Sequence, residues 1–221
     1  MTITEKLKEI DPSLELHNEG EWNNVESEFS AFNDAGLEAE VGEFLYGFLR
    51  VLKPENVLET GTHVGVGASY LGMALKDNKK GHLDTYEFLP ELHKQAINRI
   101  NKMGLAPYVT CTFKDVGQLE TKKIFDFILL DTEPQTRFSE FVRFYDNLKE
   151  GGFVFIHDLH RHMHQIPNEE HGWAWPFGKI PGFINSVVLG GQVRPFHLPT
   201  PRGLCGFYKV SKDDYKWKTN S

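Results

Sequence analysis

The sequence predicts an α/β protein with a doubly wound, mainly parallel seven-stranded sheet and an antiparallel C-terminal strand. Short apolar segments alternate with amphipathic ones from residue 56 to residue 156, as in β-α-β units, because parallel strands need crossover helices. Two apolar segments near the C-terminus are joined by the turn-rich segment 199–203, which is typical of an antiparallel pair. A length of 221 residues suffices for one such core and argues against a second full domain.

The chain divides into three parts by composition. Residues 1–33 are polar and weakly periodic, so we expect an N-terminal extension that packs over the domain. Residues 34–212 are expected to form the domain itself. Residues 213–221 mix lysines with acids, which is typical of a solvated tail.

Each element of the domain follows from apolar spacing and from helix signals. Apolar residues at three- and four-residue steps predict a helix over 37–52, with Asn33 and Asp34 as cap residues and Pro54 as its end. The same reasoning gives strands at 56–59, 82–88, 108–113, 125–131 and 153–156, with helices at 66–75, from Pro90 onward, and through 138–148. The last section is predicted as a helix at 183–189 and strands at 192–198 and 204–210.

Charge and apolar content argue against a nucleic-acid-binding, secreted or membrane-spanning protein. A net charge of −7 without a basic run argues against nucleic-acid binding. The N-terminus lacks the apolar core of a signal peptide, and no segment approaches the roughly 18 apolar residues of a membrane helix. We therefore expect a cytoplasmic protein that binds no membrane. Cys111 and Cys205 lie in apolar runs, where buried free thiols are expected rather than a disulfide.

A glycine-rich turn follows the first core strand. Gly61, Gly65 and Gly67 lie between that strand and the next helix, and Glu59 precedes them. Glycines at such a turn let the backbone approach a ligand closely. Their spacing differs from the Gly-x-Gly-x-x-Gly of dinucleotide-binding proteins. An ordinary tight strand-to-helix connection is the alternative interpretation.

The turn and the landmarks after it resemble the class I S-adenosylmethionine-dependent methyltransferases, over residues 37–210. The turn is similar to motif I of that family, and Glu87, Asp115 and Asp131 arrive in order at later strand ends. The segment Leu148-Lys-Glu-Gly-Gly152 is similar to the turn that precedes the family's fifth strand. The resemblance implies a Rossmann-like fold, with S-adenosyl-L-methionine as the cofactor.

The resemblance also assigns roles to these residues. Glu87 would accept both ribose hydroxyls, although a solvated strand-end charge is the alternative. Asp115 and Val116 would meet the adenine amino group and the ring. The cofactor-binding set implied in this way consists of Glu59, Gly61, Thr62, His63, Gly65, Gly67, Glu87, Phe88, Asp115, Val116 and Asp131.

The acceptor side is similar to two groups within the family, the catechol-type and the sugar or antibiotic O-methyltransferases. In both groups, acids at the ends of the fourth and fifth strands hold a divalent ion, which here would be Mg²⁺ or another divalent metal on Asp131 and Asp158, with His157 or Glu133 as third ligand. Two carboxylates at adjacent strand ends repel each other unless a cation lies between them. Such an ion would lower the pKa of an acceptor hydroxyl.

The chain departs from the catechol pattern at two positions. Pro134 stands where a Lys is expected, and Leu159 stands where an Asn is expected. Imidazole can serve as a general base near neutral pH, so the candidate catalytic residues are His157, His160 and Asp131. His162 and His164 lie in the same stretch, and the alternative for all the loop histidines is a solvated segment without a role.

Two further features of the C-terminal half allow two interpretations each. The aromatic stretch from Trp173 to Phe177 would either line an acceptor pocket or form a small hydrophobic cluster over the sheet. Arg202 would either reach an anionic acceptor or lie at the surface of its turn.

Three hypotheses about function follow from the sequence. The first is an enzyme that methylates a hydroxyl of a small metabolite, sugar or natural product. The second is an NAD-dependent oxidoreductase on the same type of sheet, and the third is a binding module that keeps the cofactor site without catalysis. The partner in the first case is a small-molecule acceptor, and a homo-oligomer is compatible with all three.

Overall fold

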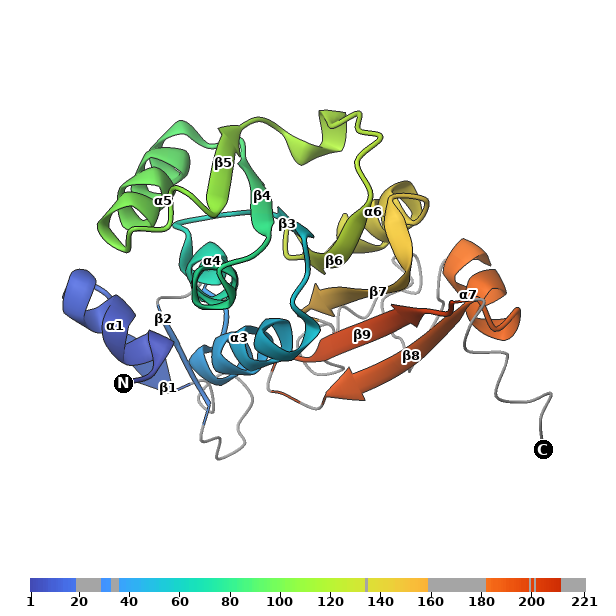
Figure 1. Ribbon diagram of the computed structural model, residues 1–221, viewed down its shortest axis with the longest axis horizontal. Coiled ribbons are helices and arrows are strands. Elements are labelled where there is room, and N and C mark those ends of the chain that lie inside the picture. The colour runs from blue at the N-terminus through green and yellow to red at the C-terminus, as the bar shows by residue number, and fades with distance from the viewer. Residues whose placement is uncertain are drawn as a thin grey trace. The chain divides into compact units, whose positions relative to one another are not determined.

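The computed structural model describes residues 1–18, 29–32, 36–133, 135–158, 182–198, 200 and 202–211. The chain forms two compact units, Met1–Glu120 and Thr121–Ser221. The first runs from blue to green in Figure 1, and the second from yellow-green to red. Within the described ranges, no helix is long and apolar enough to cross a membrane.

The first unit begins with elements that the sequence interpretation missed. Helix α1 (Ile3–Ile10) starts at a capping box in which Thr2 and Glu5 each accept the other's backbone N–H. Strands β1 (Leu16–Asn18) and β2 (Ser30–Phe32) form an antiparallel pair. The capping box was visible in the sequence as Thr-x-x-Glu. The described parts of the predicted extension, residues 1–18 and 29–32, hold regular secondary structure.

Three parallel strands form the sheet of the first unit, in the order β5-β4-β3. Their bounds are Asn56–Thr60 for β3, His82–Glu87 for β4 and Val109–Phe113 for β5. The helices are α3 (Ala39–Leu52), α4 (Val66–Asn78), α5 (Pro90–Lys102) and the short 3₁₀ turn η1 (Val116–Gln118). Helices α3 and α4 pack closely because Gly42 has no side chain, and the ring of Tyr70 occupies the space that such a side chain would need. Each strand thus ends at a connection that leads into a helix or a turn.

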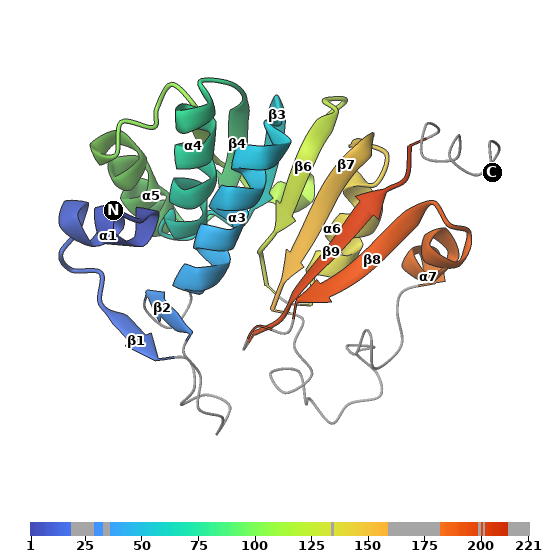
Figure 2. The ribbon, with the colours of Figure 1, turned by 60° about the horizontal axis from the view of Figure 1, so that its bottom comes forward.

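The second unit holds four strands in the order β6-β7-β9-β8, which lie side by side in Figure 2. Their bounds are Phe125–Leu130 for β6, Leu148–His157 for β7, Val193–Leu198 for β8 and Leu204–Lys209 for β9. Strands β6 and β7 are parallel, whereas β9 runs antiparallel to both β7 and β8. The helices are α6 (Arg137–Phe144) and α7 (Gly182–Leu189).

The boundary between α6 and β7 differs from the prediction. The helix expected through 138–148 ends at Phe144, and β7 already begins at Leu148. Phe125 pairs with Leu148, but Phe127 pairs with Phe153, so β7 bulges between these two pairs. Gly151 lies in the bulge with a φ of +80°, a conformation that favours glycine. The Gly-Gly turn is therefore part of a strand instead of its start.

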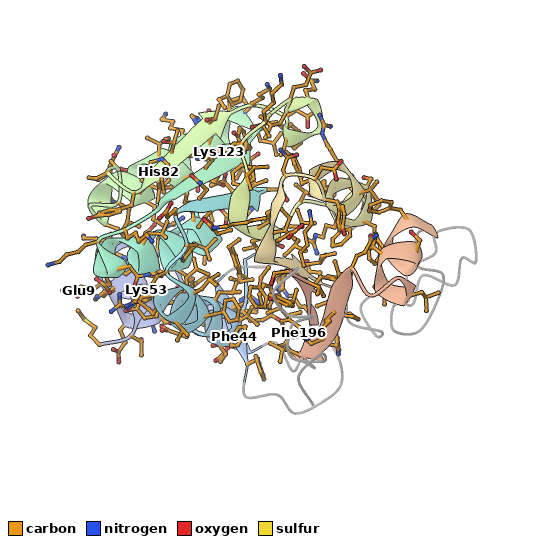
Figure 3. The ribbon with its side chains drawn as sticks, turned by 45° about the vertical axis from the view of Figure 1, so that its right-hand side comes forward. Glu9, Phe44, Lys53, His82, Lys123 and Phe196 are labelled. Atoms are coloured by element: carbon orange, nitrogen blue, oxygen red, sulfur yellow. The ribbon has the colours of Figure 1, made fainter. Side chains whose placement is uncertain are left out.

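The strand count and directions confirm the predicted fold class. The described residues hold three parallel strands in the first unit. In the second, a parallel pair is followed by β9, which runs antiparallel to its neighbours on both sides, β7 and β8. Phe196 of β8, labelled in Figure 3, packs edge-on against Phe155 with ring centroids 5.3 Å apart. Its ring also fills the space beside Gly206. Both cysteines are buried and free, as the sequence predicts.

Candidate functional site

The glycine-rich turn lies between the end of β3 and the start of α4. Gly61 and Gly65 have φ values of +79° and +86°, and His63 between them has a φ of +49°. Three left-handed residues in so short a segment need glycine at most positions, because Cβ disfavours this conformation. Gly67 lies against the Glu59 carboxylate, so any side chain there would clash. The turn is therefore compact, and the Glu59 carboxylate packs against it at Gly67.

A row of buried polar groups supports this turn. Thr85 donates a hydrogen bond of 2.6 Å to Glu59, whose side chain is 1% exposed. Since the Thr85 proton is used there, Thr62 must donate in the 2.5 Å contact between the two hydroxyls. Cys111 donates to Thr62 over 3.6 Å, and burial raises the pKa of this thiol to about 11, so it keeps its proton. These hydrogen bonds form a chain in which every donor points toward the Glu59 carboxylate. The strand register accounts for this arrangement, because Glu59, Thr85 and Cys111 are aligned across β3, β4 and β5.

Glu87 connects the end of β4 to the same turn. One carboxylate oxygen accepts the backbone N–H of His63 over 2.8 Å, and the other accepts that of Leu89, also over 2.8 Å. The turn is further tied to β4 by a 3.0 Å bond from the Thr62 N–H to the Tyr86 carbonyl. The structure therefore brings Glu87 and the glycine turn together, as the resemblance implies.

The remaining predicted residues of the first unit follow strands β4 and β5. Phe88 is 58% exposed directly after β4. Asp115 caps η1 through a 2.7 Å bond from the Gly117 N–H, and Val116 is buried. Sequence reasoning did not single out Phe113, which is 55% exposed at the end of β5. Apolar rings thus stand exposed at the ends of two neighbouring strands.

Arg99 of α5 also contacts the turn. Its side chain is buried, and its guanidinium donates to the Val64 carbonyl within the turn and, over 2.8 Å, to the Asp11 carboxylate. Hydrogen bonds from Ser13 and the Arg99 cation together hold the pKa of Asp11 below its ordinary value, against the opposing effect of burial. The residue after α1 is therefore linked through one side chain to the glycine turn. Nothing in the spacing of α5 distinguished this arginine from an ordinary surface residue.

The second unit brings together the predicted acids and histidine at adjacent strand ends. Asp131 follows β6, His157 is the last residue of β7, and Asp158 follows it. One ligand atom from each of the three lies within 4.8 Å of the others. His157 is 1% exposed, and its Nδ1 lies 3.0 Å from Asp131 Oδ1 and 3.4 Å from Asp158 Oδ1. Glu133, the alternative third ligand, is exposed and does not belong to this group.

A buried arginine that sequence reasoning missed lies between the two acids. Arg137 contacts Asp131 over 3.2 Å and Asp158 over 2.9 Å, and its side chain is 4% exposed. It is the first residue of α6, where the helix dipole disfavours a cation. An arginine at this end of a helix, six residues after a strand-end acid, was the available signal.

Several positive groups act on Asp158. Burial of this carboxyl would raise its pKa. The charges of His157, Arg137 and Arg202 outweigh that effect and hold the pKa at about 2. Arg202 is itself buried, so the interpretation of this residue as a surface arginine is wrong.

Some predicted features lie outside the described residues. They include the candidate catalytic residue His160, together with His162 and His164 and the aromatic stretch from Trp173 to Phe177. Pro134 and Leu159, the two departures from the catechol pattern, and the cap residues Asn33 and Asp34 also fall there.

Comparison with known proteins gives one matching family model and one fold. Residues 58–159 match the family model described as a methyltransferase domain. The O-methyltransferase TomG of Streptomyces achromogenes, solved with SAM, is 15% identical with a TM-score of 0.67, over 93% of this chain and 89% of that chain. An O-methyltransferase of Bacillus cereus, solved with SAH, is 18% identical with a TM-score of 0.68, over 93% of this chain and 91% of that chain.

A third structure has the same fold. The SAH-bound methyltransferase PaMTH1 of Podospora anserina is 15% identical with a TM-score of 0.66, over 95% of this chain and 94% of that chain. At such identities the likeness establishes the fold. No protein of curated function matches the chain by sequence.

Proposed function

We propose that this chain, which shares the fold of the compared methyltransferases and matches a methyltransferase domain model over residues 58–159, transfers a methyl group from S-adenosylmethionine to a hydroxyl of a small acceptor molecule. The observation that supports this most is the contact between Glu87 and the glycine turn. A strand-end carboxylate and a glycine-rich turn are joined there by the His63 N–H. Such a site suits a ligand with both a hydroxylated ring and a zwitterionic arm.

The residues of the first unit fit an adenosyl cofactor. Each Glu87 oxygen accepts one backbone N–H, and a carboxylate oxygen can accept a second hydrogen bond, so both can still receive ribose hydroxyls. The exposed rings of Phe88 and Phe113 offer apolar surface for a purine. The positive φ of Gly61 lets the backbone face a ligand without an intervening Cβ. No cationic cradle is needed, because this cofactor carries no phosphate.

The chemistry divides between the cofactor and the residues of the second unit. When bound, S-adenosylmethionine supplies an electrophilic methyl group on a sulfonium. The chain's own task is to take the proton of the acceptor hydroxyl and to orient its oxygen, which accelerates the reaction chiefly by positioning. His157, held by Asp131 over 3.0 Å, is the residue that we assign to the proton. Asp131 keeps the imidazole in one orientation.

The acceptor and the setting of the enzyme belong to the same proposal. A small molecule is the proposed acceptor, and the net charge of −7 argues against nucleic acid. A cytoplasmic location and a homo-oligomer stay predictions from the sequence. The proposal competes with the oxidoreductase, against which the glycine spacing speaks.

Isothermal titration with S-adenosylhomocysteine tests the cofactor site, because this product binds without turnover. We expect a Kd in the micromolar range, weakened about 100-fold by Glu87→Ala, since two strong hydrogen bonds to hydroxyls are lost. Glu91→Ala, an exposed acid four residues further on, is the matched control and should bind as the unmodified chain does. Absence of binding at submillimolar concentration would refute the proposal.

A second assay separates an enzyme from a binding module that has lost catalysis. The chain is incubated with S-adenosylmethionine and a panel of hydroxylated acceptors, and methylated products are detected by mass spectrometry. We expect turnover that His157→Ala abolishes while cofactor binding persists. Binding without turnover on every acceptor would instead support the module.

A further inference from the structure

The two strand-end carboxylates of the second unit already have a cation between them. The Arg137 Nη2 atom lies 3.2 Å from Asp131 Oδ1, and its Nη1 atom lies 2.9 Å from Asp158 Oδ2. A guanidinium presents its donors in a planar fork, so a single side chain can donate to both acids at once. The position between adjacent strand ends is the one that a divalent ion would be expected to occupy.

Backbone carbonyls fix Arg137 in this position. Its Nε donates to the Thr132 carbonyl over 2.8 Å, and Nη2 donates to the same oxygen over 2.5 Å. Nη1 also donates to the carbonyl of His157. Every nitrogen of the guanidinium therefore contacts an oxygen, and the side chain is only 4% exposed.

Arginine charges already oppose the two carboxylates without a metal. Arg137 contacts both acids, and the charge of Arg202 also acts on Asp158. A divalent ion placed here would have to share the carboxylates with a buried guanidinium. Like charges at such distances are costly in a buried site.

The imidazole is also poorly arranged for a metal. A ligating histidine nitrogen must offer a lone pair. His157 Nδ1 instead lies 3.0 Å from Asp131 Oδ1, and a carboxylate only accepts hydrogen bonds, so this nitrogen carries the proton. The donor set that looks like a metal site is thus already engaged in internal hydrogen bonds and ion pairs.

We propose that Arg137 is the resident cation of the Asp131–Asp158 pair, so that this cluster binds no divalent metal. For the acceptor, and resting on the proposed function, the consequence is a wider substrate class. Chelation of a metal uses two neighbouring oxygens of the acceptor, whereas an acceptor oriented by the protein's own groups can be held through a single hydroxyl. We therefore expect monohydroxylated acceptors among the substrates.

Titration with Mn²⁺, followed by the loss of its free-ion electron paramagnetic resonance signal, tests the proposal without cofactor or acceptor. We expect the full chain to leave the signal unchanged up to about 1 mM Mn²⁺, well above the concentrations at which built carboxylate sites fill. Arg137→Gln removes the cation that contacts both acids and should tighten Mn²⁺ binding at least about tenfold, since the two carboxylates then lose their shared counter-ion. Arg143→Gln, an exposed arginine of the same helix, is the matched control and should resemble the unmodified chain.

Arg137→Lys covers the case in which the Gln variant does not fold. A lysine keeps one charge but cannot bridge both acids, so this variant should also bind Mn²⁺ more tightly than the unmodified chain. Tight Mn²⁺ binding by the unmodified chain that Asp131→Asn abolishes would overturn the proposal. No gain of binding in either folded Arg137 variant would overturn it as well. Because no cofactor is present, these outcomes are independent of whether S-adenosylhomocysteine binds.

Discussion

Removing the hydrogen bond from Thr85 to Glu59 tests whether the row of buried polar groups stabilises the glycine turn. Thr85→Val keeps the shape of the side chain but removes its hydroxyl. Glu59, which is 1% exposed, then loses a 2.6 Å donor, and the Thr62 hydroxyl loses its acceptor. We expect both a less stable protein and a looser turn.

The magnitude follows from the two bonds that are lost. A hydrogen bond to a charged group contributes about 1.5–3 kcal/mol and one between neutral groups about 0.5–1.5 kcal/mol. Because both lie in a buried site, Thr85→Val should lower the free energy of unfolding by about 2–4 kcal/mol. For a chain of this size, that corresponds to a fall in Tm of about 4–16 °C.

Urea denaturation and calorimetry measure this loss, with two comparison variants. Thr112→Val makes the same chemical change at a half-buried position of β5 and should cost less than about 1 kcal/mol. Thr85→Ser keeps the hydroxyl and should lie close to the unmodified chain. If Thr85→Val is no more destabilising than Thr112→Val, the row of hydrogen bonds does not hold the turn.

Three other predictions concern charge and burial. Arg99→Met should lower the free energy of unfolding by about 3 kcal/mol and weaken S-adenosylhomocysteine binding, because Asp11 and the Val64 carbonyl lose the guanidinium as a donor. Full recovery of both properties in Arg99→Lys would contradict this prediction. Asp158 has a folded pKa of about 2, below the unfolded value of 3.8, so its contribution of about 2 kcal/mol is present above pH 4 and is lost as pH falls through 2. The stability difference between the unmodified chain and Asp158→Asn should narrow over that range, and a constant difference would argue against the shifted pKa. Burial raises the pKa of both Cys111 and Cys205, so a thiol reagent at pH 8 should label them only after unfolding. Rapid labelling of the folded chain would show instead that the two thiols are accessible.

The fold was predictable because its elements obey simple periodicities. Strands such as Phe125–Leu130 are short, apolar runs, and their terminal acids lie at the edge where parallel strands end. The same rule brought Asp131 and Asp158 to one place. The helix predicted through 138–148 was too long, because apolar spacing continues past Phe144 although the chain turns there to enter β7. Local periodicity carries no information about where a strand begins to pair.

The partners of the site residues were not predictable. Arg99 is an ordinary helix residue in sequence, and its burial depends on tertiary packing that no local pattern records. For Arg137 the signal was its place at the start of a helix, six residues after a strand-end acid, but its contacts with both acids depend on the folded structure. Thr85 was likewise one residue of an alternating strand until pairing with β3 aligned it with Glu59.

The link from Asp11 through Arg99 to Val64 has a practical consequence for handling the protein. Trimming the first eleven residues would leave the guanidinium of Arg99 beside the turn without its counter-ion. An affinity tag that disturbs α1 would act at the same place, since Thr2 caps that helix. Tags therefore belong at the C-terminus, and cofactor affinities measured on N-terminally tagged protein should be compared with those of protein from which the tag has been cleaved.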